Sequence, residues 1–267
     1  ILFLAYYERN HDAPLINLAY FKNKYVLLGI TMTVAGGAII NIFLFFDPLY
    51  LKIIKQLDPH LIGLLLVSMP AMQIIISALF PLLVKKAGLI RVMILGMLFG
   101  LIATVLNAHF TTTLSMMTIL LTFGLMGVLW GCLNTGVIML VSDHFSEKIS
   151  ATVLGFIFTF WNIAGAFFLS LSAILFHFFN KAYLSLAVKT LPSALPSVEQ
   201  QALHMAINDP SHAVQLLHQG NTNSLYALFS KSFTQALGSV SWLSCGFMML
   251  LVLLSFLLYR AINKRFC

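Results

Sequence analysis

Long, uninterrupted apolar runs dominate the hydrophobic pattern of this chain. Six runs of about 20 residues or more contain no Asp, Glu, Lys or Arg, which is the length needed to cross a bilayer core about 30 Å thick. They cover residues 25–46, 61–84, 92–110, 112–142, 149–180 and 232–259. None shows the short alternating segments that are typical of membrane β-barrels. The pattern therefore predicts six membrane-spanning helices.

The composition supports the same class. Hydrophobic residues make up 60% of the 267 residues and charged residues only 9%, against about 25% charged residues in soluble domains. This balance argues against a soluble enzyme or a disordered chain. The net charge of +7 comes with only 8 acidic residues, and no basic run is interleaved with aromatic residues. We therefore expect an all-α membrane protein whose surroundings are the lipid bilayer, with no nucleic-acid partner.

The polar stretches divide the chain into two parts. Residues 1–24 are interpreted as the end of a preceding helix and a cytoplasmic linker, because ILFLAYY opens the chain in the middle of an apolar run. Residues 25–267 form the six-helix bundle, with an extracytoplasmic loop at about 181–231. That loop contains three prolines and a capping-box pattern at 197–200, so we expect two or three short helices there. We therefore expect this chain to be a fragment of a longer protein.

The sequence predicts neither a metal site nor a cofactor. His204, His212 and His218 fall in the long loop at spacings that do not share a helix face. Exposed loop histidines are the simpler interpretation. The three cysteines form no CxxC pattern and have no Cys/His spacing typical of zinc sites.

Positive charge in the loops predicts the orientation in the membrane, because cytoplasmic loops are enriched in Lys and Arg. Ten of the fifteen basic residues lie in segments that share one side, namely Arg9, Lys22, Lys24, Lys85, Lys86, Arg91, Lys148, Arg260, Lys264 and Arg265. The other side holds Lys52, Lys55, Lys181, Lys189 and Lys231. This bias favours a cytoplasmic C-terminus.

Three segments carry a resemblance to a known family. Residues 8–22 (ERNHDAPLINLAYFK), 46–52 (FDPLYLK) and 81–91 (PLLVKKAGLIR) resemble the linker, first outer loop and cytoplasmic loop of the C-terminal half of EmrB/QacA-type fourteen-helix drug:proton antiporters. These antiporters belong to the major facilitator superfamily. The resemblance implies the six-helix half of a major facilitator fold, preceded in the whole protein by six to eight helices absent from this chain. It also implies a multi-pass protein of the plasma membrane, in bacteria the inner membrane.

The cytoplasmic loop departs from the superfamily pattern G-x-L-x-D-R-x-G-x-R. Lys86, Gly88 and Arg91 match it, but Pro81 replaces the glycine and Lys85 replaces the aspartate. The resemblance implies a gating loop formed by Lys85, Lys86, Gly88 and Arg91. Without the acid, the charge pairing of that gate is in doubt.

No catalytic pattern such as GxSxG, HExxH or a P-loop occurs, so we do not expect an enzyme. For proton coupling, Asp47 is the best candidate, since it directly follows an uncharged run and intramembrane carboxylates are typical of proton relays. Alternatively, Asp47 is an interfacial helix C-cap beside Pro48. Asp143 would more simply cap its helix or pair with Lys148.

Polar and aromatic residues at membrane depth suggest a substrate cavity. Such groups are costly in lipid unless they face a cavity or a partner. The candidates are Asn41, Met69, Gln73, Trp130, Asn134, Trp161 and Asn162. The amides could instead form hydrogen bonds between helices, and the tryptophans could be ordinary packing. Gly124, Gly127 and Gly131 predict a close helix approach.

The resulting hypothesis is part of a transporter that exports small amphipathic compounds in exchange for protons by alternating access. One alternative is a truncated half that does not transport and needs a partner. Another is a membrane docking or assembly protein that uses the long outer loop.

Overall fold

The computed structural model describes residues 22–188 and 223–263, and it contains no strand in those ranges. Six helices follow one another: α2 (Lys24–Ile53), α3 (Pro59–Ala87), α4 (Leu89–Ala108), α5 (Met116–His144), α6 (Glu147–Val188) and α9 (Asn223–Asn263). Each is long and apolar enough to cross a membrane. The prediction of an all-α membrane bundle with six spanning helices is confirmed.

The helix ends differ from the predicted ones in a consistent direction. α2 continues seven residues past 46, through Pro48 inside the helix, to Ile53. Residues 181–188 belong to α6 and 223–231 to α9, so both ends of the predicted outer loop are helical. Charge-free runs mark only the part of a helix at lipid depth, whereas its ends extend into the interface. Two ends are exceptions, because α4 ends at Ala108, before the predicted 110, and α5 begins at Met116, after the start of its apolar run at 112.

Several predicted features lie outside the described residues. These are the helix tail and linker of residues 1–21, the capping box at 197–200 and the three loop histidines.

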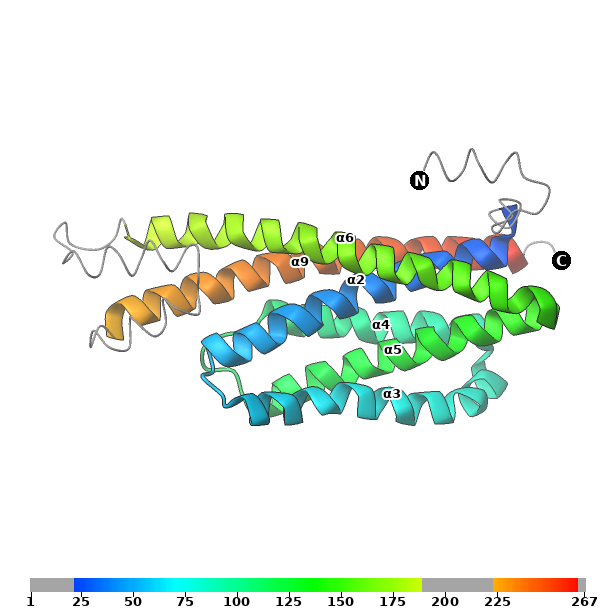
Figure 1. The fold of residues 1–267 in the computed structure, drawn as a ribbon, viewed down its shortest axis with the longest axis horizontal. Coiled ribbons are helices and arrows are strands. Elements are labelled where there is room, and N and C mark those ends of the chain that lie inside the picture. Colours follow the sequence, from blue (N-terminus) through cyan, green and yellow to red (C-terminus); the bar gives the residue numbers. More distant parts are fainter. Residues whose placement is uncertain (1–21, 189–222, 264–267) are drawn as a thin grey trace.

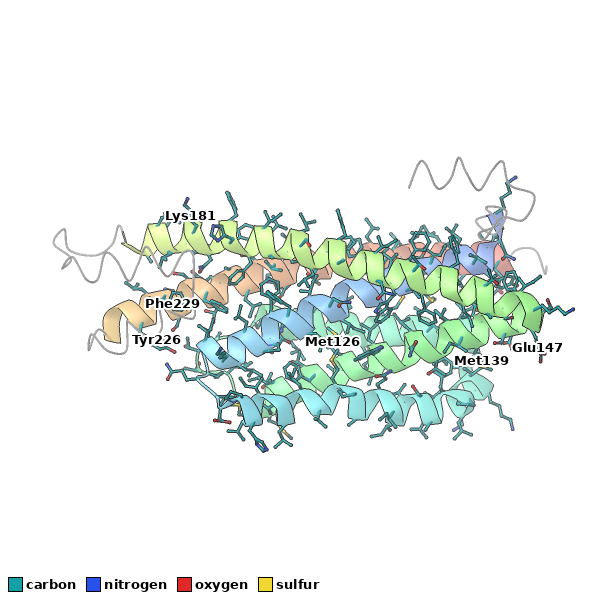
Figure 2. The ribbon with its side chains drawn as sticks, viewed as in Figure 1. Met126, Met139, Glu147, Lys181, Tyr226 and Phe229 are labelled. Carbon is teal, nitrogen blue, oxygen red and sulfur yellow. The ribbon has the colours of Figure 1, made fainter. Side chains whose placement is uncertain are left out.

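The helices run lengthwise and alternate in direction (Figure 1). The α2–α3 and α4–α5 connections lie at one end of the bundle. The α3–α4 and α5–α6 connections lie at the other end, where α2 begins and α9 finishes. We call these the connection end and the terminal end. In Figure 2, Lys181 and Tyr226 lie toward the connection end and Glu147 at the terminal end.

α2 is the central helix and packs against α5, α6 and α9. Within an 18-residue stretch of each helix, 83% of α2 is buried but only 11% of α3. α3 contacts mainly α5 and leaves Leu64, Ile74 and Leu82 more than 60% exposed. Apolar side chains of this kind suit contact with lipid or with further helices.

Candidate functional site

Two tryptophans meet on the face formed by α5 and α6. The rings of Trp130 (α5) and Trp161 (α6) are stacked, with centroids 6.5 Å apart and planes 24° from parallel. Both side chains are partly exposed. A parallel, accessible aromatic pair is a surface on which a flat or cationic molecule can lie.

Glycines of α2 set the depth of this pair. A side chain at Gly36 would collide with the Trp161 ring, and one at Gly37 would collide with the Trp161 backbone carbonyl. The absence of side chains at both positions therefore lets α6 approach α2 closely and seats the ring of Trp161 over α2. The contact of these two glycines with Trp161 was not predicted from the sequence.

The predicted amides divide into two groups. Asn41 donates to the carbonyl of Gly37 (2.7 Å), and Asn162 donates to that of Phe158 (3.2 Å), so each amide is bound to its own helix. Gln73 and Asn134 are partly exposed and form no hydrogen bond with any residue that the structure describes. These two amides are free to bind a ligand.

Met69 packs in the interface between α3 and α5 and is only 2% exposed. A side chain at Gly127 would collide with its carbonyl, and one at Gly131 would lie 3.0 Å from the carbonyl of Gln73. The predicted close approach is found at these two glycines. At Gly124 the nearest contact is 3.9 Å, from Met72.

Asp47 occupies a separate site near the connection end. It lies inside α2 and is 1% exposed, so the interpretation as an interfacial C-cap is wrong. The helix continues past Pro48, and proline is tolerated inside membrane helices because neighbouring groups satisfy the backbone carbonyl that it leaves without a donor.

A buried chain of hydrogen bonds begins at Asp47 and joins three helices. Asn107 of α4 donates from Nδ2 to Oδ1 of Asp47 (2.7 Å), and Ser241 of α9 donates from Oγ to Oδ1 of Asn107 (2.6 Å). Asn107 and Ser241 are each 2% exposed. The second carboxyl oxygen of Asp47, Oδ2, is buried and has no hydrogen-bond partner among the residues that the structure describes. Neither Asn107 nor Ser241 was predicted as a site residue. The position of Asn107, a polar residue near the end of an apolar helix, could have indicated it.

The predicted gating loop is a very short turn. Lys85 and Lys86 are exposed in the last turn of α3. Their positive charges interact favourably with the negative end of the helix dipole there. Gly88 alone separates α3 from α4 and has a φ of 86°. This left-handed conformation is one that glycine adopts without strain.

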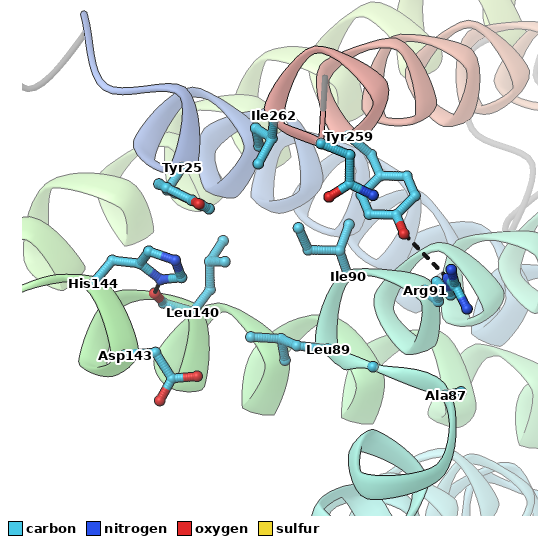
Figure 3. Close-up of a pocket in the computed structure, with 12 residues that line it drawn as sticks. Tyr25, Ala87, Leu89, Ile90, Arg91, Leu140, Asp143, His144, Tyr259 and Ile262 are labelled. Carbon is cyan, nitrogen blue, oxygen red and sulfur yellow. Dashed lines mark hydrogen bonds between the residues drawn. The ribbon is translucent and has the colours of Figure 1, made fainter. Parts of the chain in front are cut away.

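A pocket of about 440 Å³ lies beside this turn at the terminal end (Figure 3). Arg91 donates from Nε to the hydroxyl of Tyr259 (3.1 Å), which ties the start of α4 to the end of α9. On the other side, the rings of Tyr25 and His144 are 3.6 Å apart. Asp143 also lines the pocket, and it forms no ion pair with Lys148 or with any other described residue.

No group of three His, Cys, Asp or Glu residues within 22–188 and 223–263 could hold a metal ion.

Comparison with known proteins gives one family. The model of the Major Facilitator Superfamily matches residues 7–169, which is more than half of the chain and covers α2 to α5 and part of α6. A search of curated proteins found no match.

Proposed function

This chain belongs to the Major Facilitator Superfamily and is therefore a transmembrane transporter or part of one, and we propose that it exports small amphipathic compounds in exchange for protons. Its six helices are half of a major facilitator fold. Transporters of this kind enclose a midplane site between two halves and open it to each side in turn. We propose that six to eight further helices complete the site.

The stacked Trp130 and Trp161 carry this proposal. Their partly exposed rings lie on adjacent helices, and the free amides of Gln73 and Asn134 lie on α3 and α5. Adaptable, mostly apolar walls with a few polar groups suit ligands of varied shape. Ring faces also attract a lipophilic cation. Asn41 and Asn162 would flank the cavity and Met69 would support it from behind.

The exposed face of α6 suits a partner half or an aqueous cavity better than lipid. Thr159, Asn162 and Ser170 are exposed and recur at helical spacing. Each side chain donates a hydrogen bond to a backbone carbonyl of its own helix. Bulky apolar residues such as Phe167 and Ile174 occupy the neighbouring stripe, where they would meet lipid. We place the second half against the polar stripe and the exposed side of α3.

Proton coupling would use Asp47, since an intramembrane carboxyl is the type of group that proton-driven carriers use. The Lys85–Arg91 turn would gate the opposite end. We place the C-terminus and this turn in the cytoplasm on the basis of the Lys and Arg distribution. The resemblance to drug:proton antiporters is the basis for placing the chain in the plasma membrane, the inner membrane in bacteria.

Tryptophan fluorescence tests the proposed substrate site. The chain has three tryptophans, and Trp242 is 51% exposed on α9, away from the pair. In a Trp242→Phe background, a planar lipophilic cation such as ethidium is expected to quench the emission of Trp130 and Trp161 saturably. The matched variant with Trp130→Phe and Trp161→Phe contains no tryptophan, so its dye binding is followed by the fluorescence of ethidium itself. It should bind the dye at least several-fold more weakly. Equal dye binding by the two variants would rule out this site.

A second candidate is a half that does not transport, and Lys85 is the observation that favours it. The superfamily pattern has an acid at this position, which could pair with basic residues of the loop. The test uses the protein with the further helices proposed above, reconstituted in proteoliposomes. If Lys85→Asp raises dye efflux there, the loop still gates transport. If neither wild type nor Lys85→Asp moves dye under a proton gradient while the protein folds normally, the second candidate is correct.

A further inference from the structure

Asp47, Asn107 and Ser241 form a continuous buried chain of hydrogen bonds. The amide of Asn107 donates from its NH₂ group to Oδ1 of Asp47, an oxygen that can accept both in the ionised carboxylate and in an acid protonated on Oδ2. Its carbonyl oxygen then faces Ser241, whose hydroxyl donates to it. One carboxyl oxygen is thereby held, and Oδ2 remains buried without a partner.

We propose that Asn107 and Ser241 are positioning residues for Asp47 and that Oδ2 of Asp47 takes up and releases the coupling proton. This inference rests on the proton coupling proposed above and deepens it. It places the proton site between α2, α4 and α9, apart from the substrate face of α3, α5 and α6. Proton and substrate would then be coupled through α2, which carries Asp47 and packs against α5 and α6.

Within residues 22–188 and 223–263, no opposite charge compensates Asp47. Its electrostatic neighbour is Tyr50, one turn along α2, whose hydroxyl donates to the carbonyl of Thr111 (2.7 Å). The side chains of α4 and α9 in the hydrogen-bonded chain, Asn107 and Ser241, are neutral. From α6, the apolar ring of Phe176 packs against the ring of Phe46, next to Asp47 in α2. His109, at the end of α4, is exposed and turns its ring toward Trp242. In this conformation an ionised carboxylate would be a buried charge with one hydrogen bond, which is costly.

An opening to water lies next to this chain. A pocket of about 330 Å³ lies beside the contact of α4 with α9. Its lining includes Ala108 and Trp242, the sequence neighbours of Asn107 and Ser241, together with Thr111, Gly238 and Tyr183. A side chain at Gly238 would approach the carbonyl of Ala108 to 2.9 Å, so the two helices nearly touch there. A small separation of α9 from α4 would expose Asn107 and Asp47 to water, and the proton on Oδ2 could leave.

Infrared spectroscopy of the full chain in lipid vesicles tests the proposal. The C=O stretching band of a protonated carboxylic acid is followed across pH, with thermal unfolding measured in parallel. Wild type should show a buried band that titrates, and Asp47→Asn should abolish that band. Ser241→Ala and Asn107→Leu should each move the titration midpoint by about one pH unit or more, because a hydrogen bond to a charged group is lost or loosened.

Ser244→Ala is the matched control. Ser244 is buried in α9 like Ser241, but its hydroxyl donates to its own helix at Val240 (2.9 Å). It should leave the midpoint unchanged. If Asp47→Asn does not fold, Asp47→Glu should instead move the band.

Three results would overturn the proposal: no titrating band in wild type, a band that survives Asp47→Asn, or midpoints in Ser241→Ala and Asn107→Leu equal to that in Ser244→Ala. Dye quenching of Trp130 and Trp161, measured on the same samples, separates this failure from failure of the substrate site. Retained quenching without a titrating Asp47 leaves the substrate site standing and removes only the proton site.

Discussion

The backbone carbonyl of Trp161 in α6 occupies the space that any side chain at Gly37 in α2 would need. The contact sits at the most buried helix of the bundle and directly beneath the Trp130–Trp161 pair. Helices in lipid gain little from hydrophobic burial against each other, so close packing of this kind supplies much of their association. Gly37 therefore links the stability of the bundle to the geometry of the aromatic pair.

Gly37→Ala should destabilise the chain by about 1–3 kcal/mol, because overpacking against a backbone atom forces two helices apart. Gly155→Ala is the control, since no atom lies within 4 Å of the added methyl group and alanine favours the helix. Thermal unfolding in lipid nanodiscs should show a lower Tm for the first variant and an unchanged or higher Tm for the second. Equal Tm values would mean that the contact between α2 and α6 does not limit stability.

The number and order of the helices could be predicted because a spanning helix needs about 20 apolar residues, and only six runs qualify. The helix ends could not be predicted, since residues such as Asp47 and Pro48 end an apolar run without ending the helix. The hydrogen-bond partners of Asp47 could not be predicted from the sequence either. Asn107 and Ser241 lie 60 and 194 positions along the chain, and periodicity gives the face of a helix but not the residue it meets.

The candidate site shows the same division. Trp130 and Trp161 could be selected one by one, as aromatic residues away from the helix ends. Their mutual stacking depends on Gly36 and Gly37 of a third helix. Gln73 and Asn41 looked equivalent in the sequence, yet Asn41 is bound to its own helix while Gln73 is free.

Tyr259→Phe should loosen the α3–α4 turn, because it removes the acceptor that ties Arg91 to α9. A hydrogen bond of about 0.5–1.5 kcal/mol corresponds to about two- to tenfold in the opening equilibrium. Trypsin cleavage after Lys85 and Lys86 in nanodiscs should accelerate by that factor. Arg91→Gln should give the same increase, and the double variant no more than either. Additive effects would indicate that the two residues do not act as a pair.

Lys55→Met should loosen the connection end, because Nζ of Lys55 donates to the carbonyls of Thr112 (2.8 Å) and Leu114 (2.7 Å). Lys52→Met is the control, since Lys52 is exposed and lies one helical turn away. Hydrogen–deuterium exchange of residues 109–115 should increase in the first variant and not in the second. Equal exchange in both would contradict a role for the two bonds.

The stability that Lys55 contributes should also depend on pH. Burial lowers the pKa of Lys55 below the ordinary value of 10.5. The folded chain then binds fewer protons at this site than the unfolded chain, so wild-type stability rises with pH in a window just below 10.5. The difference in Tm between wild type and Lys55→Met should grow as pH rises through that window. A constant difference would contradict the lowered pKa.

Gly127→Ala should weaken dye binding without abolishing folding. An added methyl group at position 127 meets the carbonyl of Met69 and pushes α3 away from α5. Gln73 of α3 then moves away from the helix that carries Asn134 and Trp130. A loss of about 1 kcal/mol would weaken ethidium binding about fivefold, measured by tryptophan quenching in the Trp242→Phe background. Gly124→Ala, where the nearest atom is 3.9 Å away, should bind as the parent does. If both variants bind alike, the spacing of α3 and α5 has no part in recognition, and the site would consist of the α5–α6 aromatic pair alone.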